Sequence, residues 1–259
     1  MKRHIADNEL NELPTKKMYN IFIKEANTSN CPSIEQKVKT LEKSNPGFHK
    51  VSDRIHKALC YVYKQNEENK FVIANCDYLY FWLADLVYSN LVNRKSSYTV
   101  MNSIKHFLQN SKGQDICKYD KYNNNYINEN NFMDIKTLFD YTKDYDRIKN
   151  DLYRYSSYCN REYKDLLDKY KSAHNTICNT CETKSKQHSY CKDFNEFLTG
   201  KKKFELTTPA CTVQISAHEL EQMHNEQKKS REHNKNQADY PHGDINKSDY
   251  ITSNNPSAT

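Results

Sequence analysis

Glycine is scarce in this sequence, and its scarcity excludes several classes of enzyme. Loops that bind nucleotide phosphates place two or three glycines within a few residues, so that backbone N–H groups can approach the ligand. We therefore exclude P-loop NTPases, dinucleotide-binding Rossmann enzymes and kinases with a glycine loop. No serine stands in the G-x-S-x-G pattern of hydrolases either, and we expect no catalytic residues, no enzymatic activity and no cofactor. The four glycines of the 259-residue chain lie far apart, at Gly47, Gly113, Gly200 and Gly243.

Apolar residues are also few, at 36% of the chain, and no run approaches the ~18 residues that a membrane-spanning helix needs. The first residues, 1–13, are charged and lack the apolar segment of a secretory signal. The sequence therefore predicts neither a membrane span nor a signal peptide.

Aromatic residues compensate for the missing aliphatic ones, because 20 Tyr, 10 Phe and Trp82 supply large side chains to bury. Most of the chain is thus expected to fold.

Charge of one sign is not concentrated anywhere along the chain. The sequence has 39 Lys and Arg against 33 Asp and Glu, a formal net charge of +6, and the two signs are interleaved. Nucleic-acid-binding proteins usually gather basic residues on one face. The only tight basic cluster is Lys201–Lys203. We therefore expect no nucleic-acid partner.

Helical spacing of apolar residues recurs over residues 1–213, and strand-like alternation does not. This pattern predicts an all-α, multi-helix domain. A capping box is expected at Ser33–Gln36, and Pro46-Gly47 should end that helix. Residues 135–155 and 163–177 are expected to form antiparallel neighbours or one helix kinked at Ser156-Ser157, with Asp144 and Arg147 paired on the outer face. The predicted structural core consists of Leu79, Trp82, Leu83, Leu86, Leu138, Phe139, Tyr145, Ile148 and Leu152.

The composition changes after residue 213. Residues 214–259 contain almost no aliphatic side chains and many Asn, Gln, Ser, Lys and Glu residues. A segment with so little apolar surface cannot offset the entropy lost on ordering. We expect a disordered polar tail over 214–259.

Nine cysteines are spread over the domain, which suits long-range disulfides better than one local metal site. The odd number leaves one cysteine outside any intramolecular bridge, and the sequence does not identify it. Zinc binding is the alternative for His174, Cys178, Cys181, His188 and Cys191, although the first two continue the apolar stripe of a helix. We expect disulfides and no metal. The candidates are Cys31, Cys60, Cys76, Cys117, Cys159, Cys178, Cys181, Cys191 and Cys211.

Several stretches resemble a known family. Leu13–Tyr19 is similar to the opening motif of the Plasmodium interspersed repeat (PIR) proteins of malaria parasites, whose vivax branch is called VIR. Asn75–Asp85, a Cys followed by Tyr-Leu and then Trp-Leu-x-Asp, resembles the most recognisable stretch of that family. The resemblance covers about residues 10–213. It continues in Lys136–Tyr141 with Asp146–Ile148, in the Tyr-rich run into Cys178, and in Pro209–Cys211.

The resemblance implies a helical, disulfide-containing variant antigen without catalytic residues. Such a protein would be exported to the surface or cytoplasm of the infected red blood cell and act in immune evasion and adhesion. Its partner would be a host receptor protein or an antibody. Family members typically lack an ordinary signal peptide, and they usually continue into a transmembrane helix. This chain reaches Thr259 without one, so either the span lies beyond this sequence or the protein is a soluble member.

Two loops, Lys112–Asn131 and Lys184–His188, are the expected recognition surfaces because exposed loops commonly carry binding residues. Two other functions stay open at this point. One is a soluble exported scaffold inside the red cell, which binds parasite or cytoskeletal proteins with its cysteines reduced. The other is a zinc-stabilised interaction domain that uses the cluster between Cys178 and Cys191.

Overall fold

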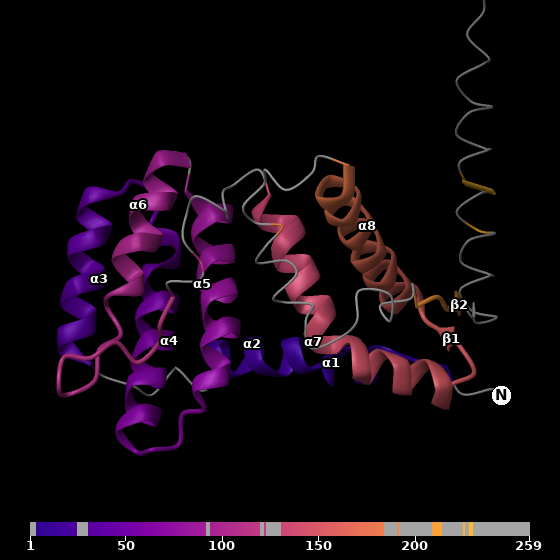
Figure 1. Ribbon diagram of the computed structural model, residues 1–259, viewed down its shortest axis with the longest axis horizontal. Coiled ribbons are helices and arrows are strands. Elements are labelled where there is room, and N and C mark those ends of the chain that lie inside the picture. The colour runs from indigo at the N-terminus through magenta and orange to yellow at the C-terminus, as the bar shows by residue number, and fades with distance from the viewer. Residues whose placement is uncertain are drawn as a thin grey trace, which may run out of the picture. The chain divides into compact units, whose positions relative to one another are not determined.

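A computed structural model gives the fold (Figure 1). It describes residues 4–24, 31–91, 94–119, 122, 131–183, 191, 209–213, 225, 228 and 229. The chain divides into two compact units, Met1–Gln214 and Ile215–Thr259. Only three residues of the second unit are described, so the predicted disordered tail lies almost wholly outside the described residues. The labelled helices and strands of Figure 1 belong to the first unit.

The described part of this unit is built from eight α-helices, which confirms the all-α prediction. A 3₁₀ turn precedes the fifth helix, and two strands of two residues each pair in parallel. Among the described residues, no helix combines the length and apolarity that crossing a bilayer requires. The elements are α1 Asp7–Asn11, α2 Pro14–Lys24, α3 Pro32–Ser44, α4 His49–Glu67, η2 Ile73–Asn75, α5 Cys76–Asn90, α6 Arg94–Lys105, α7 Phe132–Arg154, β1 Tyr158–Cys159, α8 Arg161–Thr183 and β2 Thr212–Val213.

The boundaries of α3 follow from proline and glycine. The helix begins at Pro32, which occupies the first turn, where a missing N–H costs nothing. The capping box expected at Ser33–Gln36 is therefore wrong, since Cys31 is the N-cap and makes no side-chain cap hydrogen bond. The break at Pro46-Gly47 separates α3 from α4 as expected. Gly47 has φ of 91°, and a Cβ there would lie 3.3 Å from the Asn90 carbonyl oxygen.

Helix α5 is central to the core because it is apolar on nearly every side. Six consecutive residues, Leu79–Ala84, are buried. Phe81 stacks on Phe139 of α7 with ring centroids 4.3 Å apart, and Trp82 lies 5.7 Å from Phe22 of α2. Eight of the nine residues predicted as core are buried. The ninth, Leu152, is half-buried and packs at the edge of the core.

Helices α7 and α8 are separate antiparallel neighbours, which decides between the two arrangements that the sequence left open. The contacts between them show opposite chain directions, since residue numbers fall along α7 as they rise along α8. Asp151 contacts Tyr163, Asp144 contacts Tyr170 and Tyr141 contacts His174. Ser156 and Ser157 form the turn between them with φ of 51° and 59°. Positive φ is incompatible with a continuous helix.

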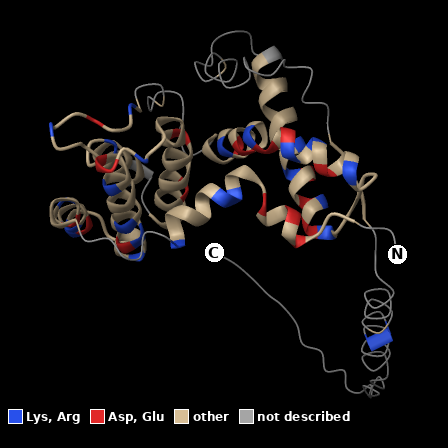
Figure 2. Ribbon diagram, turned by 90° about the horizontal axis from the view of Figure 1, so that it is seen from below, with Lys and Arg blue, Asp and Glu red and all other residues tan. Residues whose placement is uncertain are grey.

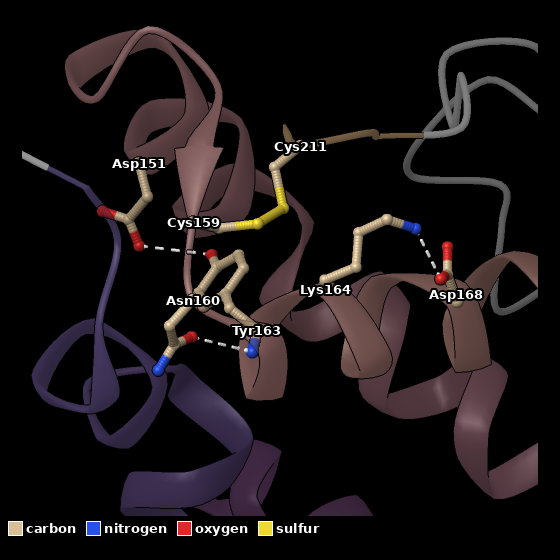
Figure 3. Close-up of a disulfide and its surroundings, with 7 residues drawn as sticks. All are labelled: Asp151, Cys159, Asn160, Tyr163, Lys164, Asp168 and Cys211. Atoms are coloured by element: carbon tan, nitrogen blue, oxygen red, sulfur yellow. Dashed lines mark hydrogen bonds and ion pairs between the residues drawn. A yellow bond between two sulfur atoms is a disulfide. The ribbon is translucent and has the colours of Figure 1, made fainter. Parts of the chain in front are cut away.

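The two strands join the ends of the unit to this turn. The Ile5 N–H donates to the Tyr158 carbonyl oxygen at 2.9 Å, and the Thr212 N–H donates to the Ser157 carbonyl oxygen at 2.8 Å. A disulfide links Cys159 to Cys211 beside these hydrogen bonds (Figure 3). Two-residue strands are too short to show alternation in the sequence, so this junction was not predicted.

Candidate interaction surface

Three carboxylates of α7 are buried, those of Asp140, Asp144 and Asp151. Asp144 joins three helices. Asp144 accepts hydrogen bonds from the Thr15 N–H at 2.9 Å, the Thr15 hydroxyl at 2.6 Å and the Tyr170 hydroxyl at 2.8 Å. These contacts tie α2 and α8 to α7. Burial raises the pKa of Asp144 from its ordinary value of 3.8 to about 6, although the hydrogen bonds from Thr15 and Tyr170 act in the opposite direction. The prediction that Asp144 lies on the outer face is therefore wrong.

Asp140 and Asp151 have similar structural roles. Asp140 accepts from the Tyr19 hydroxyl at 2.5 Å and from the Lys136 ammonium at 2.7 Å, and burial raises its pKa against the opposing effect of Lys136. Asp151 pairs with Arg147 at 2.9 Å, so the partner expected for Asp144 belongs to Asp151 instead. The Tyr163 hydroxyl donates to Asp151 at 3.4 Å (Figure 3).

Asp140 and Asp144 anchor the N-terminal motif to α7. Thr15 and Tyr19 belong to the Leu13–Tyr19 stretch, and Leu13 is itself fully buried. Burial raises the pKa of Tyr19 and of Tyr170, so both keep their protons and donate. Across the described part of the chain, no three His, Cys, Asp or Glu side chains come close enough to hold a metal ion.

Eight of the nine cysteines form four disulfides, and three of these bridges close long loops. Cys31–Cys60 links the start of α3 to α4, and Cys76–Cys117 links the start of α5 to the loop after α6. Cys159–Cys211 closes the strand junction, and Cys181–Cys191 is local, with a sequence separation of 10. The last bridge occupies two of the thiols that the zinc alternative would require. His188 lies outside the described residues.

Cys178 is the cysteine that remains a thiol. It is half-exposed on α8, and its Sγ lies 3.5 Å from Nε2 of His174, one helical turn earlier. We expect native alkylation to add one adduct per chain, at Cys178, and alkylation after reduction in denaturant to add nine. Intact-mass spectrometry measures both numbers, and Cys178→Ala should remove the native adduct. Nine native adducts, or thiols that react only after chelation, would contradict the disulfide assignment.

An open groove runs along α3 and is also lined by residues of α4, α6 and the segment after α6. Helices α3, α4 and α6 are grouped at the left of Figure 1. It consists of two adjoining hollows of about 450 and 470 Å³ that share Ser33, Lys37 and Phe107. One wall is a face of α3, and the other is the segment from Phe107 to Gly113, with Tyr63 and Lys64 of α4 between them. Elsewhere the charges are dispersed, since blue and red residues alternate along the helices in Figure 2.

Sequence reasoning identified only part of this surface. The predicted loop Lys112–Asn131 contributes Gly113, while much of its remainder, and all of Lys184–His188, lie outside the described residues. The α3 wall was missed. Its members repeat at helical spacing, as Ser33, Lys37, Thr40 and Ser44, but the same spacing is typical of any solvated helix face.

The helices and disulfides define a disulfide-stabilised helical domain that carries a surface groove along α3. A family model described as Plasmodium vivax Vir protein matches residues 13–258, and the chain belongs to this family. The match confirms the resemblance, and it extends past residue 213 into the polar segment. Vir proteins are exported variant antigens of malaria parasites, not known as enzymes. Comparison with curated proteins and with solved structures gave no significant match.

Proposed function

We propose that this protein acts as a variant antigen on the surface of the infected red blood cell, where it serves immune evasion or adhesion to a host receptor protein. Membership of the Vir family supports the general role. The observation that carries the finer proposal is the set of four disulfides. Disulfides persist in oxidising surroundings and are rare where glutathione keeps thiols reduced.

The distribution of the bridges strengthens this argument. Three of them join segments that are 29, 41 and 52 residues apart, so they cross-link the domain from α3 to β2. The six cysteines of these bridges are buried, and Cys60 and Cys159 are fully buried. A protein that worked with reduced cysteines would gain no stability from three cysteine pairs held at bonding distance. The fold therefore suits a surface that faces the extracellular medium and is read by proteins of the host.

Labelling of live infected cells tests the proposal. An antibody raised against the oxidised domain should bind intact red cells without permeabilisation, and external trypsin should remove the signal. A parasite protein known to stay inside the cell serves as the control for membrane integrity. Staining that appears only after permeabilisation would reject surface display and favour a scaffold inside the red cell.

A further inference from the structure

We propose that the groove along α3 binds an extended acidic segment of a partner protein, in which carboxylates flank one apolar side chain. The inference rests on the proposed function, because it names the chemistry of the partner that the domain would recognise. It concerns the surface lined by α3, α4 and the segment Phe107–Gly113.

The charge of the groove selects an anionic partner. Lys37 of α3 and Lys64 of α4 line it, and no carboxylate stands among the lining residues that the structure describes. Glu67 and Asp115 are not among these lining residues, and their carboxylates accept hydrogen bonds from the Ser111 N–H and the Gln109 side-chain amide. Half-exposed lysines between low-dielectric walls attract carboxylates more strongly than lysines on an open surface do.

The apolar part of the groove selects a peptide over a sulfated sugar chain. Phe107 is half-buried at the point that both hollows share, and Lys37 Nζ lies 6.0 Å from the centre of its ring. Ile34 and Leu41 of α3 also line the hollows, but both are buried, so Phe107 is the more exposed apolar contact. A sulfated glycan carries charge on most of its sugars and needs a dense cluster of cations. Two lysines beside an aromatic ring match a peptide with few acids around one apolar residue.

The length of the groove sets the length of the segment. Its α3 wall includes residues from both ends of a 13-residue helix, which spans about 20 Å at about 1.5 Å per residue. An extended chain rises about 3.3 Å per residue, so about six residues fill the groove. Hydroxyl groups along the α3 wall, including those of Ser33 and Thr40, can pair with the backbone of such a segment.

Both walls are held rigidly, which reduces the entropy lost on binding. The Cys31–Cys60 bridge fixes the first residue of the α3 wall to α4. The facing loop is tied by Cys76–Cys117 and by Asn110, whose side-chain oxygen accepts from the N–H groups of Lys112 and Gln114. Gly113 supports this turn with φ of 75°, a conformation that other residues rarely adopt.

Fluorescence anisotropy with a labelled peptide tests the proposal on the oxidised full chain. The probe is acetyl-Glu-Asp-Glu-Phe-Asp-Glu-amide, and its counterpart with lysine in place of each acid is the peptide control. We expect saturable binding of the acidic probe alone. Lys37→Gln combined with Lys64→Gln should weaken it about tenfold, since each half-exposed ion pair contributes a few-fold. Raising salt from about 0.15 M to about 1 M should also weaken it, because the Debye length falls from about 8 to about 3 Å.

The matched control is Lys39→Gln, which removes the same charge from α3 at an exposed lysine paired with Glu35 outside the groove. It should leave the affinity within about twofold. Equal losses in both variants, or no saturable binding by the native protein, would overturn the proposal. So would tighter binding of a heparin hexasaccharide that competes at the same lysines. Surface labelling of infected cells is scored independently, so a failure of the groove does not decide surface display.

Discussion

Replacing Asp144 with alanine is expected to lower the free energy of unfolding by about 2–4 kcal/mol. The substitution leaves three donors without their acceptor, namely the N–H and hydroxyl of Thr15 and the hydroxyl of Tyr170. Each orphaned buried donor costs about 1–3 kcal/mol, and relief from burying a carboxylate offsets part of the total. Equilibrium denaturation of the oxidised protein, followed by far-ultraviolet circular dichroism, measures the change.

The matched variant is Asp144→Asn, which keeps an acceptor for the Thr15 N–H and offers its amide to the two hydroxyls. We expect it to cost less than about 1 kcal/mol. Thr15→Val provides a second control, because it removes only the 2.6 Å hydroxyl contact and should cost about 1 kcal/mol. A small effect for alanine would mean that the helices hold together without this carboxylate.

The same residue should give stability a distinctive dependence on pH. Its pKa is 3.8 in ordinary surroundings and about 6 in the folded protein. Between these values the folded state binds a proton that the unfolded state lacks, so the free energy of unfolding falls as pH rises from about 4 to about 6. The fall attributable to Asp144 is about 3 kcal/mol. The difference between the native and Asp144→Asn curves isolates it from other acids, such as Glu9, whose pKa is lowered. Parallel curves would contradict the assignment.

The wrong prediction for Asp144 shows what residue spacing alone cannot establish. Its spacing from Arg147 is that of a surface ion pair, and spacing establishes only that two residues share a helix face. Whether that face is exposed depends on α2, whose Thr15 is 129 residues away in the chain. The buried network is therefore a tertiary feature, and nothing local in the α7 sequence distinguishes it from a solvated pair.

The helical fold, by contrast, could be predicted from the sequence, because it depends on local spacing. Apolar stripes such as Leu79, Leu83 and Leu86 fix both the helix and its buried face by local spacing alone. The groove was not accessible, because its walls come from α3, α4 and the loop after α6, and only the fold brings these together. The cysteine pairings had the same obstacle, since their loop lengths range from 10 to 52 residues without a local rule.

Removing the Cys159–Cys211 bridge should have the largest effect among the four disulfides. It closes the longest loop, with a sequence separation of 52, and chain-entropy arguments assign such a bridge about 4 kcal/mol. The variant Cys159→Ala with Cys211→Ala is preferred to serine, because Cys159 is fully buried and a hydroxyl there would add a polar cost. Denaturation of the two-alanine variant measures the loss of stability.

The matched control is Cys181→Ala with Cys191→Ala, which opens a loop with a separation of only 10 and should cost about 3 kcal/mol. A local measurement separates the two bridges more clearly than the stability difference. The Thr212 N–H donates to the Ser157 carbonyl oxygen at 2.8 Å, and β1 and β2 pair over only two residues each. So short a pairing has little stability of its own. Hydrogen exchange at Thr212 should therefore become fast without Cys159–Cys211 and stay slow without Cys181–Cys191. If Thr212 remains protected in both variants, the strand pairing holds the end of the unit without its disulfide, and the bridge contributes through the unfolded chain alone.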